Sequence, residues 1–169
     1  MLLSLLILAS PAAAAADPLA PARAGQLQCI NPNVAAKTCQ AMGTFTVAAD
    51  GSYQTVTRTV INPQPLIIME VKGKGKAEGE LTCGTLDKAD YEAATFTMDG
   101  AAMAEEIAGT IRTQLLGAIA PLAGKKACIA QKPEGDLILA EVTLDGTARP
   151  DLTQKMLWVK PDAGYKVAP

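Results

Sequence analysis

The chain has 169 residues, of which 49% are hydrophobic, and its net charge at pH 7 is −2. This length and apolar content fit one domain with a substantial core, and the near-neutral charge gives no electrostatic reason to expect a nucleic-acid partner. The aromatic residues are two Phe, three Tyr and one Trp, which are too few to favour a platform on which bases or sugars stack.

Residues 1–16 have the pattern of a secretory signal peptide. Leu2 to Leu8 form a short apolar run, and Ala14 to Ala16 supply small residues for cleavage before Asp17. The run is too short to cross a membrane as a helix, and it departs from the usual pattern because no Lys or Arg precedes it. We expect a periplasmic or secreted protein, cleaved near Ala16, with a flexible leader at residues 17–26 and a single domain at residues 27–169.

Four cysteines in an exported chain indicate two disulfides. Sequence alone allows three connectivities, and we favour Cys29–Cys39 with Cys83–Cys128 because the first pair brackets a compact segment. Within that segment, Asn31-Pro32 resembles a helix N-cap followed by proline at the first helical position. No CxxC spacing occurs, so neither a zinc site nor a thioredoxin-type redox motif is expected.

Most of the chain has the alternation and β-branched content of strands. Asp50-Gly51 predicts a tight hairpin turn, and residues 62–65, with two prolines, break the strand that follows it. Residues 161–164 fit a hairpin loop near the C-terminus. In chain order, strands are expected at residues 44–49, 53–61, 66–71, 78–83, 94–98, 126–131, 137–144, 154–160 and 165–167.

The segment Lys72-Gly73-Lys74-Gly75-Lys76 is predicted to be an exposed turn between two of these strands. Its three lysines suggest two interpretations. The segment is either a solvated hairpin tip, or a contact surface for phosphate or carboxylate groups of an envelope polymer. Lys72, Lys74 and Lys76 are therefore our candidate anion-contact residues.

The stretch from Asp99 to Gly124 is the one long segment with an uninterrupted helical period. We expect Asp99 to be its N-cap and Gly124 to follow its end. Its predicted core face comprises Met103, Ile107, Ile111, Leu115, Ala118, Ile119 and Leu122. Together with the strands, this predicts an α+β fold, in which one long amphipathic helix packs on one face of a mostly antiparallel sheet.

Catalytic chemistry is restricted by what the chain lacks. It has no histidine, and after the signal peptide Ser52 is its only serine, so a Ser-His or Cys-His nucleophile cannot be assembled. Histidine-based metal sites are excluded, and no GxGxxG, P-loop or EF-hand spacing occurs. We expect no cofactor.

Carboxylates are the remaining candidates for catalysis. Asp87, Asp90 and Glu92 lie close together and suggest a solvated loop, a weak calcium site or a catalytic group. Glu70 stands in an apolar strand, either as a paired residue or as an acid. Trp158 is expected in the core, with ligand binding as the other interpretation.

These observations favour a small, exported, disulfide-stabilised binding domain over an enzyme. Its partner would be an envelope or extracellular component of unknown identity. The alternative is a carboxylate-dependent hydrolase acting on an envelope polysaccharide, since such chemistry needs only two suitably spaced carboxyl groups.

The mature protein is expected to begin at Asp17. Cleavage by a signal peptidase after Ala16 removes the apolar run, and the intact mass of the exported protein measures this directly. A mass that includes residues 1–16 would contradict the assignment and indicate a retained N-terminal segment.

Overall fold

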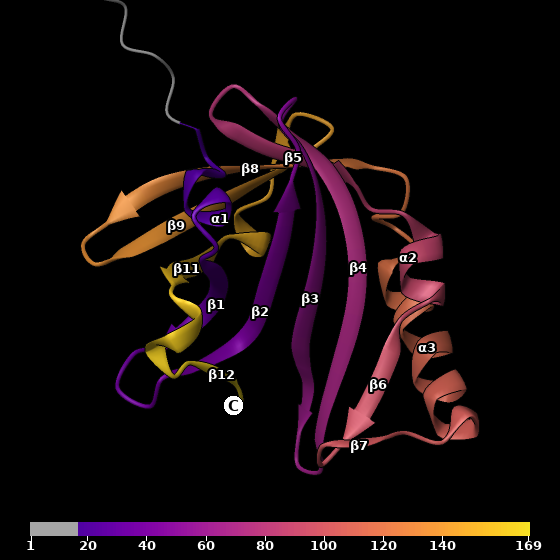
Figure 1. Ribbon diagram of the computed structural model, residues 1–169. Coiled ribbons are helices and arrows are strands. Elements are labelled where there is room, and N and C mark those ends of the chain that lie inside the picture. Colours follow the sequence, from indigo (N-terminus) through magenta and orange to yellow (C-terminus); the bar gives the residue numbers. More distant parts are fainter. Residues whose placement is uncertain (1–16) are drawn as a thin grey trace, which may run out of the picture.

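The computed structural model describes residues 17–169, so the predicted signal peptide lies outside the described residues. The central feature is a closed barrel of eight antiparallel strands (Figure 1). Its strands are β1 (Leu27–Asn33), β2 (Thr38–Val47), β3 (Ser52–Pro63), β4 (Leu66–Glu78), β5 (Leu81–Thr85), β8 (Lys126–Glu134), β9 (Leu137–Leu144) and β11 (Gln154–Val159).

The barrel follows chain order almost throughout. Strands β1 to β4 each pair with the strand that follows them in the chain. Strand β5 then pairs with β8, and β8 pairs with β9. Strand β11 pairs with β9 on one side and with β1 on the other, where Leu27 lies opposite Val159. This last pairing closes the ring and leaves none of the eight strands as a free edge along its whole length.

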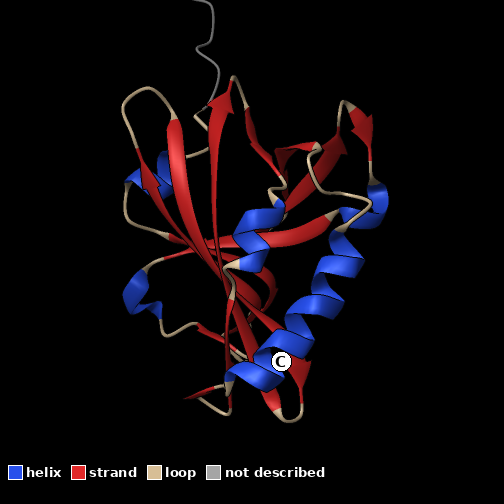
Figure 2. Cartoon of the chain, turned by 90° about the vertical axis from the view of Figure 1, so that its right-hand side faces the viewer, coloured by secondary structure: helices blue, strands red, loops and turns tan. Residues whose placement is uncertain are grey.

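Four short strands and five helical segments are added to the barrel. Strands β6 (Thr95–Met98), β7 (Ala101–Ala102), β10 (Thr147–Ala148) and β12 (Lys166–Val167) extend β4, β6, β9 and β2 respectively. The helical segments are α1 (Ala20–Arg23), α2 (Lys88–Glu92), α3 (Glu105–Ile119) and the 3₁₀ turns η1 (Pro150–Leu152) and η2 (Pro161–Ala163). Figure 2 shows α2 and α3 in front of the strands. No helix within residues 17–169 has the length and apolar character needed to cross a membrane.

The predicted α+β architecture with one long organising helix is wrong. The longest helix, α3, has 15 residues, and it belongs to an excursion (residues 86–125) inserted between two adjacent barrel strands, β5 and β8. The prediction from sequence identified most of the strands but placed them in an open sheet and not in a closed barrel. Closure depends on β11 meeting β1, a pairing between distant segments that no local pattern indicates.

Both ends of α3 and its buried face also differ from the prediction. Asp99 is no N-cap: it lies in the β6–β7 turn with a positive φ of 49°, and its carboxylate accepts a hydrogen bond from the Leu66 amide. Ala108 is buried in the cluster with Met69 and Phe96, whereas Ile107 is 49% exposed. Met103, Ile111 and Leu115 of the predicted face do pack against this cluster, so the prediction is wrong at Ile107 and missed Ala108.

A predicted helix start and a predicted turn are both strand in the structure. Asn31-Pro32 belongs to β1, and the lysine–glycine segment continues β4. Lysine and glycine are weak strand formers, yet their alternation has the period of a strand, with exposed lysines separated by half-buried glycines.

The register shows which side chains face the barrel interior, because directly opposed residues in antiparallel strands share a face. Gly75 lies opposite Tyr53 on β3 and Gly84 on β5. A methyl group at Gly75 would collide with the Tyr53 hydroxyl and the Cys83 carbonyl. The glycines of β4 and β5 thus make room in the interior for the Tyr53 ring.

The two predicted disulfides, Cys29–Cys39 and Cys83–Cys128, are both present. The first lies on the outside of the β1–β2 hairpin, where both cysteines are fully buried and Tyr165 and Ala163 pack on the same cluster. The second joins directly opposed residues of β5 and β8 at the base of the excursion.

Replacing Gly75 with alanine is expected to lower the free energy of unfolding by about 1–3 kcal/mol, because the added methyl group overpacks the interior. Gly117 on α3 is the matched control, since nothing lies within 4 Å of an added Cβ there. Gly117→Ala should stabilise by about 0.4–1 kcal/mol through the unfolded state. Urea unfolding of both variants measures the difference, and equal effects would show that Gly75 does not face Tyr53.

Candidate functional site

The barrel interior is filled with aromatic side chains toward one end. The ring of Phe45 lies 5.5 Å from Tyr53 and 5.6 Å from Trp158, measured between centroids. Trp158 donates from Nε1 to the Gln131 side-chain oxygen at 3.2 Å. Trp158, whose role the sequence left between core and ligand binding, is thus a lumen residue with a satisfied polar atom.

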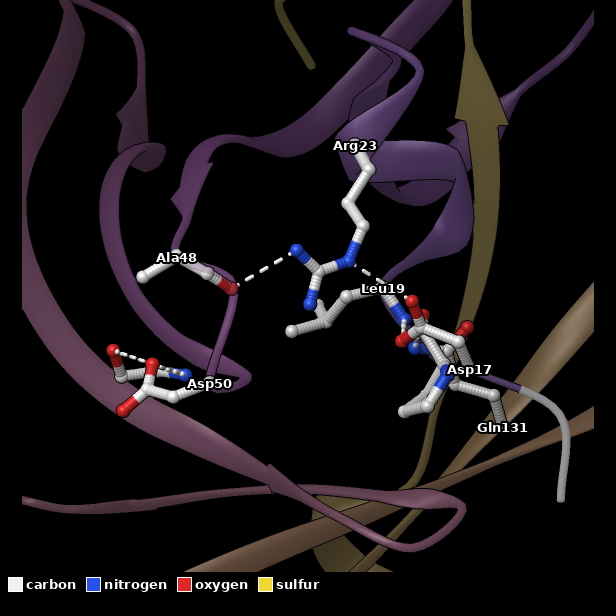
Figure 3. Close-up of polar contacts among 8 residues, drawn as sticks. Asp17, Leu19, Arg23, Ala48, Asp50 and Gln131 are labelled. Carbon is white, nitrogen blue, oxygen red and sulfur yellow. Dashed lines mark hydrogen bonds and ion pairs between the residues drawn. The ribbon is translucent and has the colours of Figure 1, made fainter.

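Helix α1 covers this end, which we call the α1 end (Figure 3). Gln131 donates to the Pro18 carbonyl at 3.2 Å, and Leu19 is 1% exposed. Arg23 donates to the Ala48 carbonyl at 2.9 Å and to the Asp17 carboxylate at 3.0 Å. Residues 17–26, expected to be a flexible leader, are held against the barrel in this structure by a buried leucine and by hydrogen bonds with Gln131 of β8 and with Ala48.

The opposite end, where the excursion begins and finishes, contains an apolar cavity of about 300 Å³. Its wall consists of interior residues of β1, β8, β9 and β11, including Ile30, Ile129, Val142 and Met156. Its rim is formed by Leu86, Leu122 and Leu152. The interior of an eight-stranded barrel is either filled with side chains or holds one small ligand. In this barrel, aromatic side chains fill the α1 end, and the apolar cavity occupies the opposite end.

Few polar groups reach the apolar cavity, and none of its lining residues is charged. Gln28, Gln154 and Tyr91 supply the hydrogen-bonding atoms. Burial raises the pKa of the Tyr91 phenol above its ordinary value, and neighbouring Asp90 raises it further, so this hydroxyl stays neutral. The cavity can accept a neutral molecule with one or two hydrogen-bonding groups.

A smaller side cavity of about 160 Å³ adjoins the apolar one and shares Leu86 and Tyr91 with it. It lies between β3, β4 and α2, and its polar lining includes Thr57, Asp87 and Asp90. Asp87 also caps α2 by accepting from the Ala89 amide at 3.0 Å. This cavity provides polar surface beside an otherwise apolar lumen.

The predicted acidic cluster is divided among separate roles. Glu92 pairs with Lys88 at 2.9 Å on the exposed side of α2, whereas Asp87 and Asp90 line the side cavity. Glu70 lies on the outer surface opposite Arg58. Within residues 17–169, the one set of three candidate metal ligands in reach of each other is Glu78 with Cys83 and Cys128, and both sulfurs of that set belong to a disulfide.

The candidate anion-contact residues Lys72, Lys74 and Lys76 are all exposed on the outer surface of β4. Lys74 and Lys76 line a groove of about 620 Å³ that also includes Gln54 and Thr46. Lys72 and Lys74 line the side cavity as well, whereas none of the three lysines lines the apolar cavity itself.

Sequence reasoning missed the apolar cavity altogether. Its residues come from five segments of the chain and meet only because the barrel closes. One signal was available: Leu137 to Leu144 alternates with small or apolar residues on one face, including Ala140 and Val142. An alanine in such a row leaves space in the core.

Comparisons of the chain with protein-family models, curated proteins and solved structures find no match.

Leu19→Ala is expected to lower the free energy of unfolding by about 2–5 kcal/mol, because it removes a fully buried side chain at the α1 end. Leu81→Ala is the control, since Leu81 is 36% exposed, and it should cost at most about 1 kcal/mol. Chemical denaturation of the mature protein measures both. An equally small effect at Leu19 would mean that α1 does not seal the barrel.

Proposed function

We propose that this protein is a small, exported, non-catalytic binding domain that holds one neutral, largely apolar ligand in its barrel. The observation that carries the proposal is the cavity of about 300 Å³ at the excursion end. Its volume lies at the lower limit of small-molecule sites, about 300–1,000 Å³. Apolar walls with a few convergent polar groups are the usual composition of such sites.

The absence of charge among its lining residues supports a neutral ligand. Moving a carboxylate or an ammonium group from water into this cavity would cost free energy, because no lining residue carries the opposite charge. Gln28, Gln154 and Tyr91 can instead satisfy a hydroxyl or a carbonyl. The chemistry corresponds to a short hydrocarbon chain or a small ring with one neutral polar group.

Binding is favoured over the alternative hydrolase because of the geometry around the carboxylates. Asp87 and Asp90 line a cavity of only about 160 Å³, and Asp87 is occupied in capping α2. A polysaccharide chain needs a longer open cleft in which two carboxyl groups flank one bond.

Decanol and decanoate are suitable probes, because they share a chain length and differ in charge. Trp158 is the only tryptophan and lies two residues from Met156 of the cavity wall, so its fluorescence reports on occupancy. We expect decanol to bind measurably more tightly than decanoate at neutral pH. Calorimetry provides the independent measurement.

Filling the cavity should abolish decanol binding without unfolding the protein. Ala140 is 7% exposed and lines the cavity, so Ala140→Leu places extra carbons where the ligand would sit. Affinity should fall at least about tenfold, since each displaced CH₂ carries about 0.8 kcal/mol. Ala127→Leu, also in the lining, is a second variant, and Ala130→Leu on the outer surface of β8 is the control. Decanol binding that survives both lumen variants would contradict the proposal.

A further inference from the structure

We propose that the outer surface of β4 is a second binding site, independent of the lumen, for a linear anionic polysaccharide. Lys72, Lys74 and Lys76 alternate along one strand, so their side chains leave the same face. Neighbouring lysines are therefore spaced by roughly 6.8 Å along the strand. This arrangement is a straight row of three ammonium groups.

The row has no internal partner among the described residues. None of the three lysines takes part in an ion pair within residues 17–169. Glu78, at one end of the row, is paired with Lys126 at 2.7 Å. Glu70, at the other end, lies opposite Arg58. Glu78 is thus compensated by another cation, and Glu70 has a cation across the ladder without forming an ion pair with it.

Three further carboxylates flank the row, and one of them is Asp87, which lines the side cavity together with Lys72 and Lys74. Asp50 receives hydrogen bonds from the amide and hydroxyl of Ser52, at 3.0 Å and 2.7 Å, and lies near Lys76. Asp90 of α2 borders the hollow beside Lys72 and Lys74. These carboxylates reduce the net positive charge around the lysine row. They therefore favour a ligand that forms hydrogen bonds as well as carrying negative charge.

Edge protection accounts for only part of the lysine row. Lysines often mark exposed sheet edges, where they prevent strand-to-strand aggregation. Lys76, however, lies in the middle of the sheet, with Ser52 of β3 on one side and Cys83 of β5 on the other. Lys72 and Lys74 lie between the part of β4 that pairs with β6 and the part that pairs with β5, so edge protection applies to these two and leaves Lys76 unexplained.

The groove beside the row supplies neutral hydrogen-bonding groups that suit sugar hydroxyls. Lys74 lies opposite Gln54, which in turn lies opposite Thr46. Gln54 and Thr46 line the groove of about 620 Å³ together with Ser52 and Thr85. A polymer with one carboxylate per sugar can pair with the ammonium row while its hydroxyls meet this lining. Recognition of this kind uses charge and hydrogen bonds, so it does not need the aromatic stacking surface that the chain lacks.

Polygalacturonate, which has a carboxylate on each sugar, is the probe for the proposed chemistry. Neutral dextran tests for hydroxyl contacts alone, and polyphosphate tests for charge alone. We expect polygalacturonate to bind at low salt and to weaken at physiological salt, where the screening length is about 8 Å. Dextran should not bind measurably, and polyphosphate should bind more weakly than polygalacturonate at equal charge concentration.

The decisive comparison uses two triple variants with the same change in net charge. Replacing Lys72, Lys74 and Lys76 with glutamine should reduce polygalacturonate affinity at least about tenfold, given modest gains at each exposed contact. The control replaces three lysines with glutamine: Lys132 of β8, Lys155 of β11 and Lys160, which directly follows β11. Its affinity should stay within about twofold of the parent. Equal losses in both variants would overturn the site, because overall charge would then explain binding.

A further variant separates a sugar site from a simple cation surface. Thr46→Val with Gln54→Leu keeps the lysines and removes the neutral hydrogen-bonding groups. Polygalacturonate binding should weaken several-fold while polyphosphate binding stays unchanged. If both polymers respond alike, or if polyphosphate binds the parent more tightly than polygalacturonate, the polysaccharide assignment is wrong. Thermal unfolding of each variant confirms that the barrel is intact, and decanol binding should be unaffected by all of them.

Discussion

The pairing of β11 with both β1 and β9 is the interaction on which the rest of the structure depends. Once the sheet is a ring, every strand has an inside and an outside, and alternate residues are committed to one or the other. The inner set must then be apolar, small or internally hydrogen-bonded. Gly75 and Gly84 leave space for the Tyr53 ring, and Gln131 accepts a hydrogen bond from Trp158.

Local patterns predicted much of the strand content and both disulfides, because alternation, β-branched residues and turn residues act over a few neighbours. These local patterns failed where a feature depends on residues that are far apart in the sequence. The Lys72–Lys76 segment was assigned to a turn because its composition suits one, although its alternation matches a strand whose inner face needs glycine. The face of α3 was predicted only in part, because the sheet that it covers, with Met69 and Phe96, receives Ala108 as well as the larger apolar side chains. The lysines could be proposed as a contact surface from sequence, whereas the cavity could not, since its wall forms only when remote strands meet.

The barrel separates two kinds of surface by a single layer of backbone. On β4 the residues that point outward are lysines, and those between them are glycines that face the lumen. The exterior of this wall is therefore charged and hydrated, while the cavity on the opposite side of the barrel lumen has no charged lining residue. Ligands of opposite polarity can be held by one small domain, because the lysines and the apolar lining belong to different parts of its surface.

The Cys83–Cys128 bond lies at the neck of the excursion, where residues 86–125 leave and rejoin the barrel. This bond and the β5–β8 ladder hold the two strands in register regardless of what the intervening chain does. The excursion can therefore gain, lose or exchange residues over generations while the eight strands keep their order, since longer surface loops add little entropic cost. Leu86, Tyr91 and Leu122, which belong to this insertion, border the apolar cavity. Descendants of one barrel can thus acquire different ligand preferences by remodelling a segment that the barrel does not need for its own closure.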